Sequence, residues 1–571
     1  MTNPGVCPSE VDPLKGEEGD LGGSGVGAPT SPSKKSKGAC GGGLRFSRLS
    51  GWRTAAFLFS LFLCLTIVFA FSFILPCPTR PDYLQTWNRT LHAAATYDFL
   101  AIEYIDEDKV KDVLFTYKSN KGSEENKTCE SEGLSSPCVF VLAVDGTHGN
   151  NIWELPLNYD LLWAQCGLGV AGVEGKGTCL FAHTNTLTAI SYTGNVLWQQ
   201  SSSPGVGAAL PVLSVPDLNG DGTEDLALIL PQQNQMKLVF LSGKTGVTLG
   251  SEVEVCGEVS SSHMLHQTAK KAQYLLLQTG SGLIAEGLWN LVAKAGLQKE
   301  VKKDAAWEKR RNGTGPIMIY PSRSLQRVSS VSLGGGVPPL LLMTGPSPSA
   351  AEGEQDTSQP GGVSIMELLD GQSLTSRWRA NTTKLLSQPT FGFFNKDDIP
   401  DVVMEEDTGN GTKRVVVLDG NSGLELWSVT LQHVPHAPAP ASIVTLHSYS
   451  VFMLWGEMLG NQTESGTDKH FSNLLYPYYA DVLLQKTIPV EQIIACEVTL
   501  LERGRHAAYL VLTGPHASEG AEPEAAGSVV LTKRKLKGDI TDSLVLGVRG
   551  TVAPDNAESI KEAFQRLRFQ D

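Results

Sequence analysis

The stretch Leu418–Trp427, with the sequence LDGNSGLELW, decides the fold because its pattern recurs along the chain. In each copy a strand ends in a Gly-containing turn, and the chain resumes with an apolar or Trp-bearing strand. The other copies are Val144–Trp153, Tyr192–Trp198, Leu241–Leu249 and Leu369–Trp378. Asp-Gly and Gly-x turns supply the positive φ angles of tight hairpins, and we expect each Trp to pack back between sheets.

The spacing of these copies predicts a β-propeller. The separations from Asp145 to Thr193, from Thr193 to Ser242 and from Asp370 to Asp419 are 48, 49 and 49 residues. A four-stranded propeller blade occupies about 40–50 residues. The sequence therefore predicts an all-β fold with one propeller of seven or eight blades over residues 87–550. A helix at the C-terminus, within 551–571, is expected to pack on it.

A second stretch, Ala55–Leu75, is apolar and carries no charge. At about 1.5 Å per helical residue it spans roughly the 30 Å of a bilayer core. It is longer than the apolar region of a signal peptide, so we expect an uncleaved signal-anchor helix over 54–75; cleavage near Ala70–Ser72 is the alternative. The segment 1–53 is predicted to be a disordered cytoplasmic tail, and 76–86 a juxtamembrane linker.

Charge and glycosylation sequons predict the orientation of this anchor. Residues 31–53, directly before it, carry six basic residues and no acidic one, and Arg80 is the one basic residue in the first dozen positions from Pro76. Positive-inside counting places the N-terminus in the cytosol. All six Asn-x-Thr sequons follow the anchor, which fits a lumenal or extracellular domain. They are Asn88, Asn126, Asn312, Asn381, Asn410 and Asn461. The sequence predicts a type II membrane glycoprotein of the cell surface or the secretory pathway.

Composition narrows the class of partner. The chain has a net charge of −14, and residues 76–571 alone carry −16. An acidic exterior argues against nucleic acid as a partner and against docking onto anionic lipid. We expect an unidentified protein partner.

Seven of the ten cysteines lie beyond the anchor, where disulfides persist. Two pairs are close enough in sequence to close small loops, Cys129 with Cys138 and Cys166 with Cys179. Because seven is odd, at least one thiol is free or pairs between chains. Cys77 directly follows the anchor, so a homodimer linked through Cys77 is a hypothesis. The pairing of Cys256 and Cys496 is open.

An acidic loop precedes a strand at three places, and one copy predicts a calcium site. Asp217–Asp225 has the sequence DLNGDGTED, and weaker copies occupy Asp106–Asp112 and Asn395–Asp401. These loops resemble the calcium-binding turns of FG-GAP repeats in integrin-alpha propellers. We expect a structural Ca²⁺ ion bound with a dissociation constant of roughly 10⁻⁴–10⁻³ M. Its ligands would be Asp217, Asn219, Asp221, Thr223 through its carbonyl, and Asp225. The alternative is a hairpin whose carboxylates only cap backbone amides.

Several short motifs together resemble the family with sequence similarity 234, in particular its member A group. They are Phe62–Cys64, Pro76–Pro78, Tyr97–Leu100, Ser136–Cys138, Pro216–Asp217, Arg505–Tyr509, Leu512–Pro515 and Arg566–Arg568. The resemblance covers nearly the whole chain. It implies a single-pass membrane glycoprotein with a lumenal propeller and no established activity. The first and third acidic loops carry Tyr104 and Phe393 where the FG-GAP pattern begins with Asp, which weakens the case for metal there.

The sequence offers no recognisable catalytic motif. Gly167–Gly172 matches G-x-G-x-x-G, but the residues after it do not open a helix. The Trp-bearing turns also resemble quinone-cofactor dehydrogenase propellers, yet the adjacent cysteines of those enzymes are missing here. We therefore expect a non-enzymatic protein-interaction or assembly module. The alternative is a cryptic hydrolase-like enzyme of the secretory pathway with its site in the propeller channel, which convergent carboxylates and a His would favour.

Overall fold

The computed structural model describes residues 51–74, 86–106, 108–124, 127–158, 160–169, 177–232, 235–255, 262–322, 325–346, 364–459, 469–490, 492–501, 504–517, 527–548 and 556–570. The chain divides into two compact units, Met1–Thr79 and Arg80–Asp571. Residues 1–50 of the predicted tail (1–53) and residues 76–85 of the predicted linker (76–86) lie outside the described residues.

The first unit contains one described helix, α1 (Gly51–Ile74), which coincides with the predicted anchor almost to its end. The side chains described in it, among them Phe57, Phe62 and Phe69, are exposed. Among the residues that the structure describes, none of the helices has both the length and the apolar character needed to cross a membrane.

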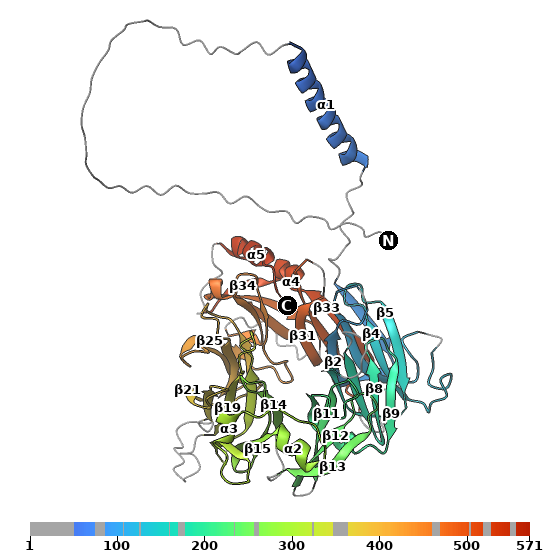
Figure 1. Cartoon of the computed structure of the whole chain (residues 1–571). Coiled ribbons are helices and arrows are strands. Elements are labelled where there is room, and N and C mark those ends of the chain that lie inside the picture. The colour runs from blue at the N-terminus through green and yellow to red at the C-terminus, as the bar shows by residue number, and fades with distance from the viewer. Residues whose placement is uncertain are drawn as a thin grey trace, which may run out of the picture. The chain divides into compact units, whose positions relative to one another are not determined.

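The second unit folds into eight antiparallel sheets that form the blades of a propeller (Figure 1). We number the blades in the chain order of their inner strands. Blade 1 consists of β2 (Ala94–Glu103), β3 (Asp112–Ser119), β4 (Cys138–Val144) and β5 (Asn151–Leu157). Blade 2 consists of β6 (Leu161–Leu168), β7 (Thr178–His183), β8 (Thr186–Ser191) and β9 (Val196–Ser201). Blade 3 consists of β10 (Ala209–Val215), β11 (Asp225–Gln232), β12 (Gln235–Leu241) and β13 (Thr248–Val255). Blade 4 consists of β14 (His263–Gln267), β15 (Gln273–Thr279), β16 (Gly282–Gly287) and β17 (Ile317–Pro321).

The remaining blades complete the ring. Blade 5 consists of β18 (Arg327–Val331), β19 (Leu340–Pro346), β20 (Ser364–Leu369) and β21 (Ser376–Thr382). Blade 6 consists of β22 (Thr390–Gly392), β23 (Asp401–Gly409), β24 (Thr412–Leu418), β25 (Glu425–Gln432) and β28 (Glu457–Met458). Blade 7 is β26 (Ala441–Val444), β27 (Ser450–Trp455), β29 (His470–Leu475), β30 (Val482–Ile488) and β34 (Leu544–Gly547). The blade count is therefore eight, and blades 6 and 7 have a fifth strand that the repeat did not predict.

Blade 8 joins the two ends of the propeller. Its strands β31 (Ile493–Leu500), β32 (Ala507–Thr513) and β33 (Ser528–Lys535) come from the C-terminal part of the chain. Its outer strand is β1 (Trp87–His92), which pairs with β33 from Trp87 opposite Lys533 to His92 opposite Ser528. This pairing closes the ring with backbone hydrogen bonds, so the first propeller strand is held by the last blade.

Each Trp of the repeat fastens its blade to the next one. The Trp198 indole of blade 2 donates a hydrogen bond to the Gly243 carbonyl of blade 3 (2.8 Å). It also lies against Gly246, where a Cβ would come within 2.4 Å of the ring. Gly246 has a φ of +71°, so glycine serves both the turn and the close contact. The same indole-to-carbonyl bond joins Trp87 to Gly146, Trp153 to Tyr192, Trp378 to Gly420 and Trp427 to Ala480.

A one-residue bulge aims these indoles. In blade 6, Val417 lies opposite Trp427 and Leu418 opposite Glu425, which leaves Leu426 without a partner. The extra residue turns the following Trp toward the neighbouring blade. The same register shift precedes Trp153, Trp198 and Trp378.

Helices occupy two insertions and the C-terminus. Blade 4 carries α2 (Leu288–Lys294) and α3 (Ala305–Glu308), and Trp307 of α3 supplies the indole that bonds to Gln372 of blade 5 (3.1 Å). Helix α4 (Leu536–Asp542) follows β33. Helix α5 (Ala557–Gln565) lies within the predicted C-terminal helix and buries Ile560 and Phe564. Its N-cap is Asn556.

Candidate functional site

The three acidic loops all connect an inner strand to the second strand of its blade, in blades 1, 3 and 6. In each, the last Asp is fully buried and begins the second strand. Asp225 accepts hydrogen bonds from the backbone N–H of Leu218 (2.6 Å) and of Gly243 (3.1 Å), one on each oxygen. Because Gly243 also accepts the Trp198 indole bond, this carboxylate completes a link between two blades. Asp112 and Asp401 bond in the same way to Gly146 and Gly420.

The rest of the predicted calcium loop lies near the surface and forms hydrogen bonds with itself. Asp217 accepts from the N–H groups of Gly220 (2.5 Å) and Gly222 (3.1 Å). Asp221 accepts from the N–H (3.0 Å) and hydroxyl of Thr223 and from the Asn219 amide (2.8 Å). These bonds outweigh the opposing effect of burial and lower the pKa of Asp221 to about 2.

Only some of the five predicted ligands are therefore placed to bind Ca²⁺. Asp217, Asn219 and Asp221 present oxygen donors of the kind that Ca²⁺ prefers, and Thr223 could add its carbonyl. Asp225 is fully buried, and each of its oxygens accepts a backbone N–H bond, so it is less open to a cation than the partly exposed Asp217 and Asp221. The donor set that fits is thus smaller than the predicted one.

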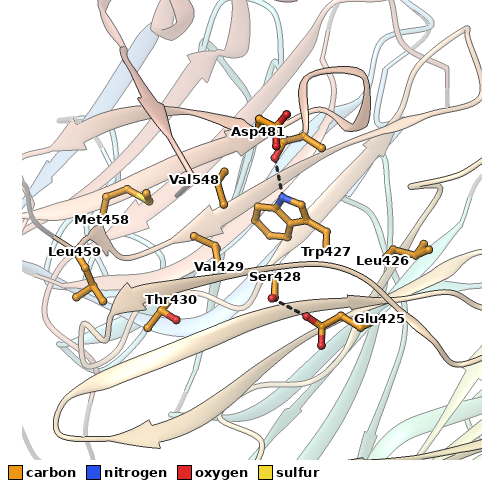
Figure 2. Close-up of a pocket in the computed structure, with 11 residues that line it drawn as sticks. Glu425, Leu426, Trp427, Ser428, Val429, Thr430, Met458, Leu459, Asp481 and Val548 are labelled. Atoms are coloured by element: carbon orange, nitrogen blue, oxygen red, sulfur yellow. Dashed lines mark hydrogen bonds between the residues drawn. The ribbon is translucent and has the colours of Figure 1, made fainter. Parts of the chain in front are cut away.

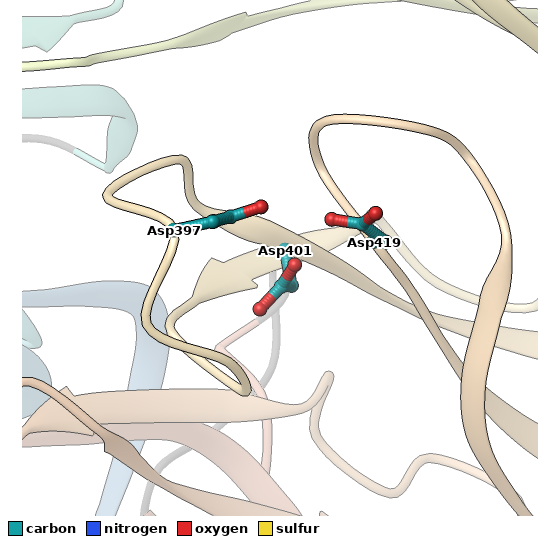
Figure 3. A group of neighbouring side chains, drawn as sticks. All are labelled: Asp397, Asp401 and Asp419. Atoms are coloured by element: carbon teal, nitrogen blue, oxygen red, sulfur yellow. The ribbon is translucent and has the colours of Figure 1, made fainter.

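Beside the third loop three carboxylates come together, those of Asp397 and Asp401 from the loop and that of Asp419 from the turn after β24. One carboxylate oxygen from each of Asp397, Asp401 and Asp419 lies within 4.8 Å of the other two (Figure 3). Three carboxylates this close together could hold a metal ion. Burial raises the pKa of Asp401, whereas hydrogen bonds from Ser422 and Asn421 outweigh burial and lower the pKa of Asp419. All three carboxylates also accept hydrogen bonds from groups of their own loops.

The sequons and cysteines lie as follows. Asn88, Asn312, Asn381 and Asn410 are exposed, as a glycosylation site must be, while Asn126 and Asn461 lie outside the described residues. Disulfides join Cys129 to Cys138 and Cys166 to Cys179. Cys496 is a free thiol on β31, and Cys77 and Cys256 lie outside the described residues.

Two cavities lie at one mouth of the central channel, where inner strands begin. One, of about 410 Å³, is lined by residues of β2, β6 and β10, including Phe99, Trp163 and Leu210. The other, of about 550 Å³, is lined by β31 and by residues 436–439, which precede β26. Both are lined by Asp98 and His516, so they adjoin. We call the residues of these two cavities the channel mouth.

The inner strands of this half of the ring are long and bulged. Strands β2, β6, β10 and β31 have 10, 8, 7 and 8 residues, whereas β14, β18, β22 and β26 have 5, 5, 3 and 4. The register of each long strand shifts near its start, at Tyr97–Phe99, Leu162, Leu210–Val212 and Ile494. The pairings of the four short strands run without a shift in the described residues.

Side chains from neighbouring blades hold these bulges. The Gln165 amide of blade 2 donates to the Val212 carbonyl (2.8 Å) and accepts from the Val212 N–H (2.7 Å). His263 of blade 4 lies 2.7 Å from the Pro211 carbonyl. In blade 1 the Tyr97 hydroxyl donates to Asp160 (3.1 Å), which also pairs with Lys118 (2.6 Å). Bulges supported in this way commonly re-aim side chains at functional sites.

The mouth is acidic and partly apolar. Leu162 and Leu210 are 56% and 46% exposed. Asp98 is 74% exposed and lies 3.7 Å from His516. Burial raises the pKa of Glu497 and that of the neighbouring Cys496 thiol, so this thiol is a poor nucleophile at neutral pH.

A further cavity of about 570 Å³ lies on the outside of blade 6, beside β25 (Figure 2). Its wall includes Trp427, whose indole bonds to Ala480 (2.8 Å), and Ser428, which bonds to Glu425 (2.7 Å). Glu425 in turn pairs with Arg414 (2.5 Å). The Trp427 bond joins blade 6 to blade 7, whereas Ser428, Glu425 and Arg414 bond to one another within blade 6.

Comparison with known proteins assigns the family. A family model described as FAM234A/B beta-propeller matches residues 87–570. The chain belongs to the FAM234A/B β-propeller family. The match begins at Trp87, the first residue of the ring-closing strand, and the family resemblance expected from the sequence is confirmed.

Relatives in the FAM234A/B family align over nearly the whole chain. Protein FAM234A of Bos taurus is 35% identical and that of Homo sapiens 34%, each over 92% of both chains. Protein FAM234B of Gallus gallus is 28% identical over 91% of this chain and 83% of its own.

The chain also resembles solved structures, only loosely. Saccharomyces cerevisiae Sqt1 gives a TM-score of 0.39 at 8% identity, covering 79% of this chain and 98% of its own. The WD40 domain of SCAP from fission yeast gives 0.37 at 10% identity, covering 80% and 97%.

The sequence analysis did not predict the channel mouth. The one local indication of it in the sequence is Pro211, because a Pro within a strand-like run marks an edge strand or a bulge. Tyr97–Leu100, which carried part of the FAM234A/B resemblance, proves to contain the bulge of blade 1.

Proposed function

We propose that this chain is a single-pass type II membrane glycoprotein whose propeller binds a protein partner without catalysing a reaction. The observation that carries the proposal is the channel mouth, an open and rigidly supported surface made by four bulged inner strands. Its one free thiol has a raised pKa, and the family description names a fold and no reaction. The final location is the cell surface or an earlier compartment of the secretory pathway.

Two features support the membrane arrangement. The stretch Ala55–Leu75 carries no charge, and all six sequons follow it. Enzymatic removal of N-glycans should lower the apparent mass of the protein. An N-terminal tag should be inaccessible to antibody in intact cells, and access without permeabilisation would contradict the orientation.

Proximity labelling tests the binding role. A labelling enzyme fused to the C-terminus of the full chain should modify a reproducible set of membrane or lumenal proteins. The control is the same fusion with the propeller deleted. Identical labelling by both fusions would remove the proposal.

A cryptic hydrolase-like activity is the second candidate, favoured by the convergence of Asp98, His516 and Glu497 on the mouth cavities. The purified full chain would then hydrolyse at least one chromogenic ester, peptide or phosphate substrate, and Asp98→Asn would abolish that reaction. Activity that persists in Asp98→Asn, or none in either protein, removes this candidate.

We also propose that Asp217, Asn219 and Asp221, with the Thr223 carbonyl, bind Ca²⁺ weakly. The ion would supply positive charge to the loop and order its turn, a structural role. A dimer linked through Cys77 is proposed as well, and a non-reducing gel that shows only monomer would contradict it.

A further inference from the structure

We propose that the channel mouth binds an extended basic peptide segment of the partner, with a Lys or Arg side chain at Asp98 and an adjoining apolar side chain between Leu162 and Leu210. This inference rests on the proposed function and deepens it, because it names the class of segment that is recognised and the residues that recognise it.

The charge of the mouth favours a cation. Asp98, Asp160 and Glu497 line the two cavities, and of these Asp160 is paired with Lys118 (2.6 Å). Asp98 is shared by both mouth cavities, and its exposed carboxylate lies 3.7 Å from His516. A carboxylate in a concave surface of its own sign attracts and orients a positive ligand.

The apolar part of the mouth favours a second contact beside that charge. Leu162 and Leu210 are exposed because the bulges of β6 and β10 place them outside the regular alternation of their strands. Tyr97, Phe99 and Trp163 line the same cavity. Large exposed apolar side chains rimmed by polar ones are typical of binding surfaces. A Lys or Arg followed by an apolar residue matches both features.

Geometry favours an extended peptide over a compact ligand. The two cavities adjoin at Asp98 and His516 and run from β10 to the segment before β26, so the mouth is elongated. It already holds one extended segment of this chain. Thr96 of β2 donates to the Pro515 carbonyl (2.9 Å) and accepts from the Ala517 N–H (2.7 Å). Addition of an extended strand to a sheet edge is a common mode of peptide recognition.

Fluorescence anisotropy with synthetic peptides tests this inference. The probes are fluorescent decapeptides with one Arg-Leu pair in a Gly/Ser background, and a matched set with Glu-Leu. Purified full-length protein in detergent should bind the Arg-Leu set more tightly, and added salt should weaken that binding. Asp98→Asn should weaken it about ten-fold, the loss of one charge-assisted contact. Asp542→Asn, which changes an exposed carboxylate on α4, should leave it unchanged.

Two results would overturn the inference: equal binding of the two peptide sets, including no binding of either, or unchanged binding in Asp98→Asn. Leu162→Gln provides a second variant that should also weaken binding, in case Asp98→Asn alters folding. Proximity labelling separates the two proposals. A partner labelled equally by wild type and Asp98→Asn overturns the mouth as its site and leaves the proposed function intact, whereas no propeller-dependent labelling removes the proposed function itself.

Discussion

The two ends of the blades use the same local device, the β-bulge, for different purposes. At the turn end, where the Gly turns lie, a bulge precedes Trp153, Trp198, Trp378 and Trp427 and directs each indole into the next blade. At the mouth end, bulges occur in blades 8, 1, 2 and 3 and direct Asp98, Leu162 and Leu210 toward solvent.

The difference teaches how to separate stability from binding in a repeat fold. A feature that returns around the ring satisfies the same packing need in each blade. The bulges of the inner strands occur in only half of the ring, so the packing of the repeated blades does not require them. The bulge of β10 is nevertheless held by hydrogen bonds from Gln165 and His263. We therefore expect changes at the turn end to lower stability and changes at the mouth end to lower binding.

The largest expected loss of stability follows from Trp198→Ala. The indole is 7% exposed and bonds to Gly243 across the blade interface. Truncating a buried Trp costs about 3–5 kcal/mol of unfolding free energy. Leu162→Ala at the mouth end of the same blade should change it by less than about 0.5 kcal/mol. Chemical denaturation measures both, and equal losses would break the distinction between the two ends.

Gly146→Ala should cost about 1–3 kcal/mol, because a Cβ there would lie 2.0 Å from the Lys111 carbonyl and the backbone must shift. Gly207→Ala, at the mouth end, meets no atom within 4 Å and is expected to be neutral. The denaturation midpoints of the two variants provide the comparison. A neutral Gly146→Ala would show that the turn end tolerates more movement than we infer.

A smaller effect should appear in the pH dependence. Burial raises the pKa of Asp112 to about 6 from the ordinary value of 3.8. The folded state then binds more protons than the unfolded state between these values, so this group makes stability rise as the pH falls from about 6 toward 4. Asp112→Asn should remove that contribution. The free energy of unfolding is measured against pH for both proteins. A difference between wild type and variant that stays constant over this range would contradict the prediction.

The smallest effect expected is that of calcium. With a dissociation constant of roughly 10⁻⁴–10⁻³ M, about 2 mM Ca²⁺ should stabilise the protein by about 0.6–1.8 kcal/mol. Asp221→Ala should abolish this gain. A thermal melt of the wild type that calcium leaves unchanged would show that the loop uses its carboxylates only to cap backbone amides.

The turn end could be predicted from the sequence because its determinants are local. Gly at a positive φ and Trp a few residues later are fixed by the turn itself, so copies of Leu418–Trp427 reveal the blades. The blade count could not be settled, because blade 8 is assembled from β1 and from strands about 400 residues further on. The role of Asp225 was also hidden, since its partner Gly243 belongs to a turn that only folding brings near.

The mouth end could not be predicted because a bulge depends on the pairing partner. Whether Tyr97–Phe99 continues the ladder or leaves it is decided by the register with β3, in which Thr96 and Leu100 find their partners two residues apart. The composition of β2 gives no sign of this shift. The exposure of Leu162 likewise follows from its register with β7.

One measurement tests the division between the two ends most directly. A photo-crosslinking amino acid is placed at Leu162 or at Val196, two exposed apolar positions at opposite ends of blade 2, 56% and 48% exposed. Each full-length variant is expressed in cells and irradiated, and its adducts are compared on a gel. We expect a discrete protein adduct from position 162 and none from position 196. An adduct from position 196 alone would contradict the account, because the partner would then bind the end that we assign to stability.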